Sequence, residues 1–184
     1  AARGRVVARL TAQTREGTTN IVTVLGRVAI PSHGIWIRIS LPVLPNGTTG
    51  WVPRAALGGY GVVDTHLIVD RRGMTAVLMR AGRPVFHALI GIGGASTPTP
   101  AGEFYVRDEL TRYSSATYGP LAFGTSARST TLTDWPAGGY VGIHGTDQPW
   151  LLPGRVSHGC IRMRNADILR LGRLMPVGTP ITIR

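Results

Sequence analysis

Cys160 is the only cysteine in the chain, and two histidines stand close enough in the sequence to act with it. They lie in two short blocks, residues 143–146 (IHGT) and residues 156–163 (VSHGCIRM). A thiol attacks as the thiolate, and a free cysteine ionises only near about pH 8.5, so a nucleophile at neutral pH needs a base. An imidazole within hydrogen-bond reach supplies one. These residue types therefore point to nucleophilic catalysis by Cys160.

His144 is the better candidate for the base, although His158 is nearer in the sequence. Residues two apart in an extended chain project to the same face but sit about two residues' rise apart, whereas a histidine at the end of a separate strand can meet the thiol across the fold. His144 ends a predicted strand over residues 140–144, so we assign it as base and His158 as a structural or electrophilic neighbour. The backbone amides of residues 158–160 could form an oxyanion hole, because Gly159 lets the backbone approach a developing charge.

Two other interpretations of the same residues stay open. His144, His158 and Cys160 could ligate zinc, since two histidines and a cysteine form a known catalytic set. Against this, no second cysteine or suitable carboxylate stands at ligand spacing, so we expect no metal and no cofactor. A lone cysteine is also often a small buried apolar residue, but the sequence His-Gly-Cys is unusual for a packed core strand.

Composition favours a β-rich protein with a sizeable core. Of 184 residues, 43% are hydrophobic, while 25 Gly and 13 Pro exceed what long helices tolerate. No apolar run reaches the roughly 18 residues of a membrane span. The net charge of +11 comes entirely from arginine, but the arginines are scattered and form no stripe with interleaved aromatics. We therefore expect no nucleic-acid partner, and a fixed anionic partner fits the charge equally well.

The chain divides into two predicted modules, residues 1–58 and residues 59–184, joined near Gly58-Gly59-Tyr60-Gly61. The first contains short β-branched segments separated by turns, at residues 21–25, 27–30, 35–39 and 50–52, which indicates a small all-β barrel. Its runs WIRI (residues 36–39) and GWVP (residues 50–53) resemble the bacterial SH3-like modules of envelope proteins. That resemblance implies a wall-associated role, and simple packing on the neighbouring module is an equal alternative.

The second module is predicted to be mainly β with one C-terminal helix. Runs at residues 62–69, 74–80 and 85–92 predict an antiparallel meander, and further strands are expected at residues 103–107, 140–144 and 180–183. Apolar residues at helical spacing predict a helix to about Met175, with Asn165 as an N-cap without a chemical role. Aromatic residues in the loops could line a substrate groove or anchor the loops: Tyr113, Tyr118, Trp135 and Trp150.

The block HGT (residues 144–146) followed by SHGCIRM (residues 157–163) resembles the catalytic signature of the L,D-transpeptidase family. The resemblance covers residues 60–184 and includes a threonine-proline run at residues 97–104. It implies that Cys160 attacks, that His144 is the base, and that amides of residues 158–160 stabilise the tetrahedral intermediate. Ser157 and Arg162 match site-shaping positions. Gly145 has no side chain, so a backbone carbonyl or a distant side chain must orient His144.

The family reaction implies the substrate, the inhibitors and the location. Cys160 would attack a peptidoglycan tetrapeptide stem after its diamino acid, release D-alanine, and pass the acyl group to an acceptor amine to form a crosslink. Carbapenem-type β-lactams would acylate the same thiol. L,D-carboxypeptidase activity at the same site, or a non-catalytic wall-binding protein, are the alternatives. Because the polymer lies outside the membrane, we expect an exported protein whose signal or anchor has been removed, in which a free thiol is unusual unless it serves catalysis. The oligomeric state is not predicted.

Overall fold

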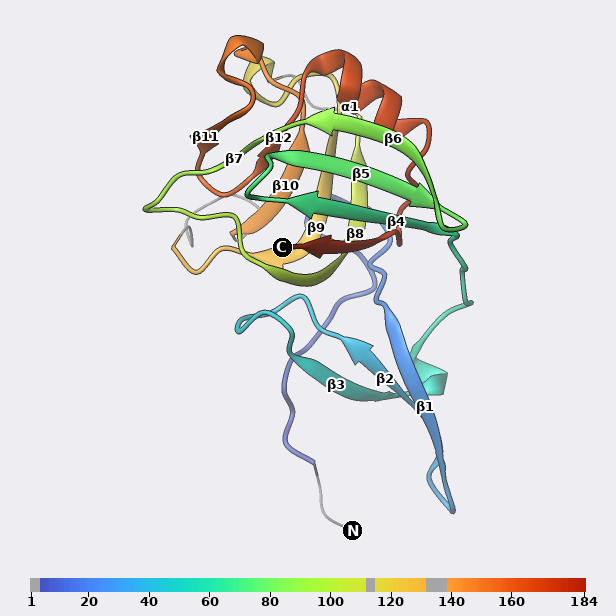
Figure 1. The fold of residues 1–184 in the computed structure, drawn as a ribbon. Coiled ribbons are helices and arrows are strands. Elements are labelled where there is room, and N and C mark those ends of the chain that lie inside the picture. Colours follow the sequence, from blue (N-terminus) through green and yellow to red (C-terminus); the bar gives the residue numbers. More distant parts are fainter. Residues whose placement is uncertain (1–3, 112–114, 132–138) are drawn as a thin grey trace.

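The structure is a computed structural model of the chain that describes residues 4–111, 115–131 and 139–184. It contains a three-stranded sheet and a ten-stranded sheet. Figure 1 shows the small sheet at the end that carries the N-terminus, and the large sheet, which ends with the C-terminus, beside it. No helix in the described ranges is long and apolar enough to cross a membrane.

The small sheet is antiparallel, in the order β1 (Val24–Ile30), β2 (Gly34–Ser40) and β3 (Thr49–Pro53), followed by the 3-10 helix η1 (Arg54–Ala56). The predicted segments 21–25 and 27–30 are not separate strands, because β1 runs from Val24 to Ile30 with a register shift near Gly26. Alternate residues of β2, Ile37 and Ile39, are buried in a small core of their own. Closure into an SH3-like barrel, and the division at residues 58/59, stay predictions.

The ten-stranded sheet has the order β11-β7-β12-β10-β9-β8-β13-β4-β5-β6. Its strands are β4 (Thr65–Asp70), β5 (Thr75–Arg80), β6 (Arg83–Leu89), β7 (Gly91–Gly93), β8 (Gly102–Leu110), β9 (Ala122–Arg128), β10 (Tyr140–His144), β11 (Gly154–Ser157), β12 (Ile161–Arg162) and β13 (Pro180–Ile183). Short 3-10 helices η2 (Ala116–Tyr118) and η3 (Pro149–Leu151) and the helix α1 (Asn165–Gly172) complete the module. The predicted mainly β class with one α-helix is confirmed.

The predicted meander is present, but its third run is divided. β4, β5 and β6 pair antiparallel as expected. Residues 91–93 instead form β7, which pairs with β11 and β12 at the other end of the sheet. Three parallel pairs make the sheet mixed: β13 with β4, β10 with β12, and β11 with β7. Parallel strands need crossover connections, so residues distant in the sequence become neighbours here.

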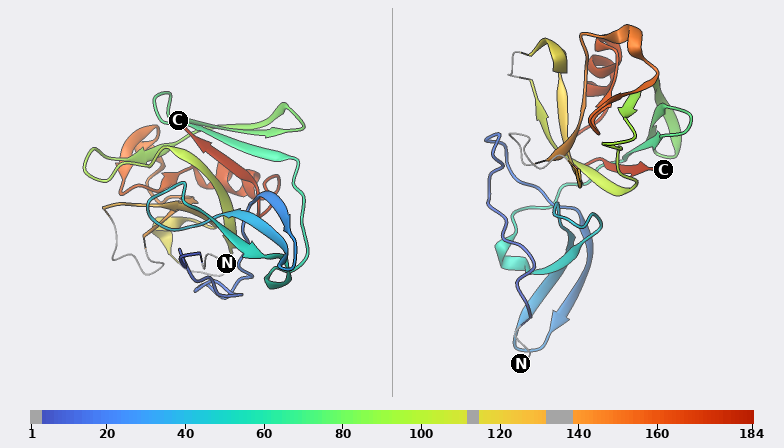
Figure 2. Two further views of the ribbon diagram at one scale, coloured as in Figure 1. Left: turned by 90° about the horizontal axis from the view of Figure 1, so that it is seen from below. Right: turned by 90° about the vertical axis from the view of Figure 1, so that its left-hand side faces the viewer.

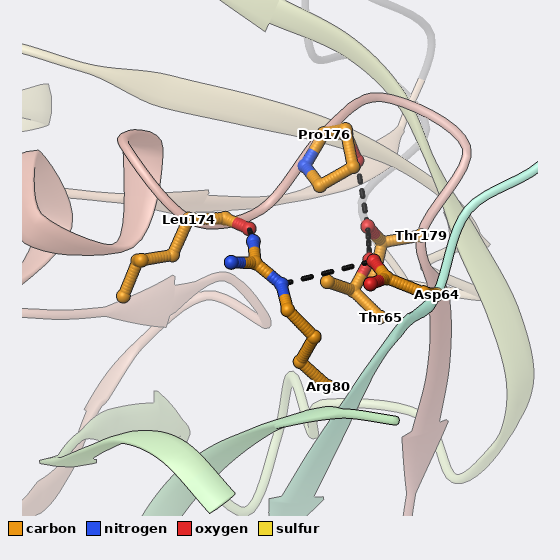
Figure 3. Close-up of polar contacts among 6 residues, drawn as sticks. All are labelled: Asp64, Thr65, Arg80, Leu174, Pro176 and Thr179. Atoms are coloured by element: carbon orange, nitrogen blue, oxygen red, sulfur yellow. Dashed lines mark hydrogen bonds and ion pairs between the residues drawn. The ribbon is translucent and has the colours of Figure 1, made fainter. Parts of the chain in front are cut away.

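Polar contacts at the start of β4 join it to the chain after α1 (Figure 3). The Thr65 and Thr179 hydroxyls lie 2.7 Å apart, and Thr179 Oγ1 donates to Pro176 O at 2.7 Å. Nearby, Arg80 Nη2 donates to Leu174 O at 2.6 Å. The Arg80–Asp64 ion pair, at 3.7 Å, is largely exposed and therefore contributes little stability. The buried threonine pair is the part of this cluster that matters for stability.

The small sheet's module contacts the large sheet along β9 and β10. Asn46 pairs with the backbone of Arg128 in both directions, because its Nδ2 donates to Arg128 O at 2.8 Å and its Oδ1 accepts from Arg128 N at 2.9 Å. Tyr140 Oη donates to Pro42 O at 3.2 Å. Figure 2 shows the two sheets as ribbons from two further sides. The first module thus rests against the strand that ends in His144.

Candidate active site

Cys160 lies between β11 and β12 and is half-buried, with a free thiol. Its Sγ accepts a hydrogen bond from the Gly142 amide of β10 at 3.4 Å. Burial raises the pKa of the Cys160 thiol, and the Gly142 amide and Arg162 only partly oppose this. The thiol is therefore protonated at neutral pH and needs a base to become a nucleophile.

His144 ends β10 and is 2% exposed. Its Nδ1 lies 2.6 Å from the carbonyl oxygen of Gly145, and since that oxygen can only accept, Nδ1 carries the proton. Nε2 is thereby left with its lone pair. Burial lowers the pKa of His144 to about 4, with the Gly145 hydrogen bond opposing the shift. The backbone carbonyl next in the chain thus orients a neutral imidazole.

The sheet brings the two side chains together. β10 and β12 pair in parallel, with Ile143 opposite Ile161 and His144 opposite Arg162. A Cβ built on Gly142 would lie 3.8 Å from both Cys160 Sγ and His144 Cδ2. Thiol and imidazole therefore flank the same glycine, and both line one cavity of about 440 Å³.

Tyr118 from η2 also lines this cavity. Its ring centroid lies 4.7 Å from that of His144, with the planes at 63° in an edge-on contact. Burial raises the pKa of Tyr118 to about 12, so its phenol stays neutral. Of the other loop aromatics, Trp150 is exposed and outside the cavity lining, while Tyr113 and Trp135 lie outside the described residues.

The turn before the thiol is held by Ser157. Its Oγ donates to Cys160 O at 2.6 Å and accepts from the Gly159 amide at 3.1 Å. Gly159 has φ +116°, a conformation that favours glycine. The Gly159 amide is thus occupied, and within the described chain the amides of His158 and Cys160 are the unpaired donors of the expected oxyanion group. The His158 side chain is exposed and does not line the cavity.

Thr99 supports this turn from outside. Thr99 is 1% exposed, and its Oγ1 donates to Gly159 O at 2.8 Å. Thr99 Oγ1 also accepts a hydrogen bond from the Gly93 amide at 2.9 Å. Thr99 therefore links β7 to the turn at residues 157–160, here called the catalytic turn. The threonine-proline run was visible in the sequence, but nothing in it indicated this contact sixty residues away.

Asn165 is not the N-cap that its position predicted. The N-cap is Arg164, without a side-chain cap, and Asn165 Oδ1 instead accepts from the Thr146 amide at 2.9 Å. The same oxygen lies so close to Gly119 and Gly145 that a Cβ at either glycine would collide with it. Asn165 thus positions the segment whose carbonyl orients His144. The helix also ends earlier than predicted, at Gly172.

Arg162 follows the thiol on β12 and is half-buried. Burial raises the pKa of Cys160 and Arg162 partly opposes this, whereas burial and then Arg162 both lower the pKa of His144. Its Nε is shielded from solvent and has no hydrogen-bond partner in the described ranges. Arg162 does not line the cavity, so its effect on the two side chains is electrostatic.

Known proteins match the part of the chain that carries this site. The family model described as the L,D-transpeptidase catalytic domain, YkuD, matches residues 64–183. The YkuD protein of Bacillus subtilis (strain 168) is 32% identical over 121 residues, and that of Bacillus licheniformis is 34% identical over 121 residues. Each match covers 66% of this chain and 66% of the relative, so the chain spans just under two thirds of their length.

Solved structures share the fold. A structure described as the Ldtfm–avibactam carbamoyl enzyme is 27% identical with a TM-score of 0.52, covering 67% of this chain and 49% of that one. An L,D-transpeptidase from Mycobacterium smegmatis has a TM-score of 0.51 and covers 89% of this chain and 99% of its own. At 18% identity it is informative about the fold alone.

Proposed function

Because the chain belongs to the YkuD family of L,D-transpeptidase catalytic domains, we propose that it is a peptidoglycan L,D-transpeptidase with Cys160 as its nucleophile. The observation that carries this proposal is the pairing of a free thiol with a neutral, oriented imidazole at the edge of one cavity. No metal or cofactor takes part in the proposed reaction.

The first half of the reaction forms a thioester. His144 Nε2 takes the Cys160 proton as Sγ attacks the carbonyl carbon of the diamino acid, which forms the amide bond to the terminal D-alanine of a tetrapeptide stem. The amides of His158 and Cys160 stabilise the oxyanion. When the tetrahedral intermediate collapses, the carbon–nitrogen bond breaks, and the imidazolium returns the proton to the amine of the departing D-alanine.

The second half of the reaction releases the acyl group. An acceptor amine attacks the thioester carbonyl and loses its proton to His144, and the carbon–sulfur bond breaks. The thiolate then recovers the proton from the imidazolium. Water in place of the amine gives an L,D-carboxypeptidase, so the crosslinked product distinguishes the two activities. Since the polymer lies outside the cytoplasmic membrane, the proposal includes export.

Intact-mass measurement with a carbapenem tests the nucleophile, in wild type and in Cys160→Ala. A covalent inhibitor is a reasonable probe because a solved structure that is 27% identical to this chain is described as an avibactam carbamoyl enzyme. We expect one adduct on the wild type and none on the variant. No adduct on folded wild type would contradict the assignment of the thiol.

Incubation with a disaccharide tetrapeptide tests the reaction. We expect released D-alanine together with a crosslinked dimer, identified by mass. D-alanine with only a tripeptide product would instead show the carboxypeptidase. Binding without release, in a protein whose thiol is acylated by carbapenem, would favour the wall-binding alternative.

A further inference from the structure

The wall of the catalytic cavity carries a buried carboxylate that the mechanism does not use. Asp108 on β8 lines the cavity and is 2% exposed. Its Oδ1 accepts from the Gly124 amide at 3.0 Å. Its Oδ2 is shielded from solvent and has no partner in the part of the chain that the structure describes. A buried carboxylate oxygen without a partner costs free energy, which a bound donor would recover.

Neighbouring charges leave Asp108 available to a ligand. The Arg107 guanidinium lies over the ring of Tyr140, 4.0 Å from its centroid, and no ion pair joins it to Asp108 among the described residues. Burial raises the pKa of Asp108, Arg107 lowers it, and Glu16 raises it again. The effect of Glu16 means that a second carboxylate lies near the first.

Glu16 reaches the cavity from the first module's N-terminal segment. It stands with Arg15 at the tip of a turn closed by Thr14 and Thr18, whose backbones bond at 2.8 Å and whose hydroxyls lie 2.8 Å apart. Both tip residues line the cavity. This part of the cavity wall is thus built from two segments about ninety residues apart, each supplying one carboxylate and one arginine.

Strand register sets the distance from this wall to the nucleophile. Asp108 lies opposite Gly124, and Gly124 lies opposite Gly142, whose amide bonds Cys160 Sγ. Two strand spacings put Asp108 and Gly142 roughly 10 Å apart. A Cβ on Gly124 would collide with the Asp108 carboxylate, and a Cβ on Gly142 would lie 3.8 Å from Sγ. The carboxylate and the thiol therefore stand on the same face, with glycine between them.

We propose that Asp108 and Glu16 form the subsite for the terminal amino group of the donor's diamino acid, an inference that rests on the proposed function. From the reacting carbonyl to the terminal amine of an extended diaminopimelate side chain there are six bonds, or about 7 Å, the span of two extended residues. A carbonyl at Sγ therefore places the amine beside this wall. Arg107 and Arg15 suit the carboxylate that diaminopimelate carries next to that amine.

Binding to the Cys160→Ala protein tests the subsite without requiring turnover. Calorimetry compares a tetrapeptide containing diaminopimelate with one containing 2-aminopimelate, the same side chain without the terminal amine. We expect the first to bind about 10- to 100-fold more tightly, the usual effect of a charged hydrogen bond. Asp108→Asn, added to Cys160→Ala, should reduce this preference to about threefold or less. Glu16→Gln should reduce it by a smaller factor, because Glu16 is half-exposed.

Glu109→Gln is the matched control, since Glu109 is the next residue of β8 but is exposed and outside the cavity lining. It should keep the full preference. Equal binding of the two peptides by Cys160→Ala overturns the subsite, and so does an unchanged preference in folded Asp108→Asn and Glu16→Gln. Selective binding combined with no D-alanine release by the wild type would refute the proposed transpeptidase and leave the subsite standing.

Discussion

The buried imidazole predicts an unusual pH dependence for acylation of the thiol. His144 has a pKa of about 4 because burial disfavours its charged form, against an ordinary value of 6.5. At pH 5.5 a base with a pKa of about 4 is about 97% neutral, whereas an ordinary histidine is about 9% neutral. The acylation rate at pH 5.5 should therefore stay close to its value at pH 7.5. With an ordinary histidine as base, the rate would fall about tenfold over the same interval.

Stopped-flow acylation by a carbapenem from pH 3.5 to pH 8 measures this dependence. We expect the acid limb near pH 4, present in His158→Gln and absent from the residual rate of His144→Gln. A limb near pH 6.5 in the wild type would refute the reasoning, because it would mean that the imidazole is solvated. Loss of the acid limb in His158→Gln would mean that His158, and not His144, is the base.

The same shift predicts a loss of stability in acid. Between about pH 6.5 and pH 4 the unfolded chain binds a proton at His144 that the folded chain does not, so stability falls as the pH falls through this window. A difference of about 2.5 in pKa corresponds to about 3 kcal/mol. Urea unfolding of wild type and His144→Gln at pH 7 and pH 4.5 should show a steeper loss in the wild type. Equal losses would contradict the assignment.

Three further predictions concern positioning and stability. Asn165→Ala leaves the Thr146 amide unpaired, so acylation should slow about tenfold and the free energy of unfolding should fall by about 1–3 kcal/mol. Asn165→Asp keeps the acceptor oxygen and should keep most of the acylation rate. Gly159→Ala places a side chain at φ +116°, so the free energy of unfolding should fall by about 1–3 kcal/mol and acylation should slow. Denaturant unfolding and intact-mass measurement check the two effects. Wild-type stability and rate in this variant would exclude a strained turn. Thr179→Val leaves the buried Thr65 hydroxyl without its hydrogen-bond partner, so the free energy of unfolding should fall by about 1–3 kcal/mol while the acylation rate stays the same. A changed acylation rate would contradict a purely structural role for Thr179.

Local patterns in the sequence indicated several of the strands and the two residues proposed to react. Short apolar runs bounded by turn residues predicted β4, β5 and β10, because a strand of this length can be recognised within a short window. Cys160 and His144 could be proposed because few residue types act as nucleophile or base, and both stand in distinctive blocks. The missing side chain of Gly145 left two ways to orient His144, a backbone carbonyl or a distant side chain.

The tertiary structure decided everything that depends on contacts between distant segments. The identity of the carbonyl that orients His144, the bond from Asn165 to Thr146, and the support of the catalytic turn by Thr99 follow from the packing of a helix, a turn and a strand end. Asn165 was assigned to a cap because local propensity favours that role, and tertiary packing overrode it. Asp108 gave no signal in the sequence, because a carboxylate becomes notable only when the sheet buries it in the cavity that also holds the thiol. The sequence by itself indicated which two side chains are proposed to react. Only the fold determined what holds and desolvates them, because burial and register are properties of the assembled sheet.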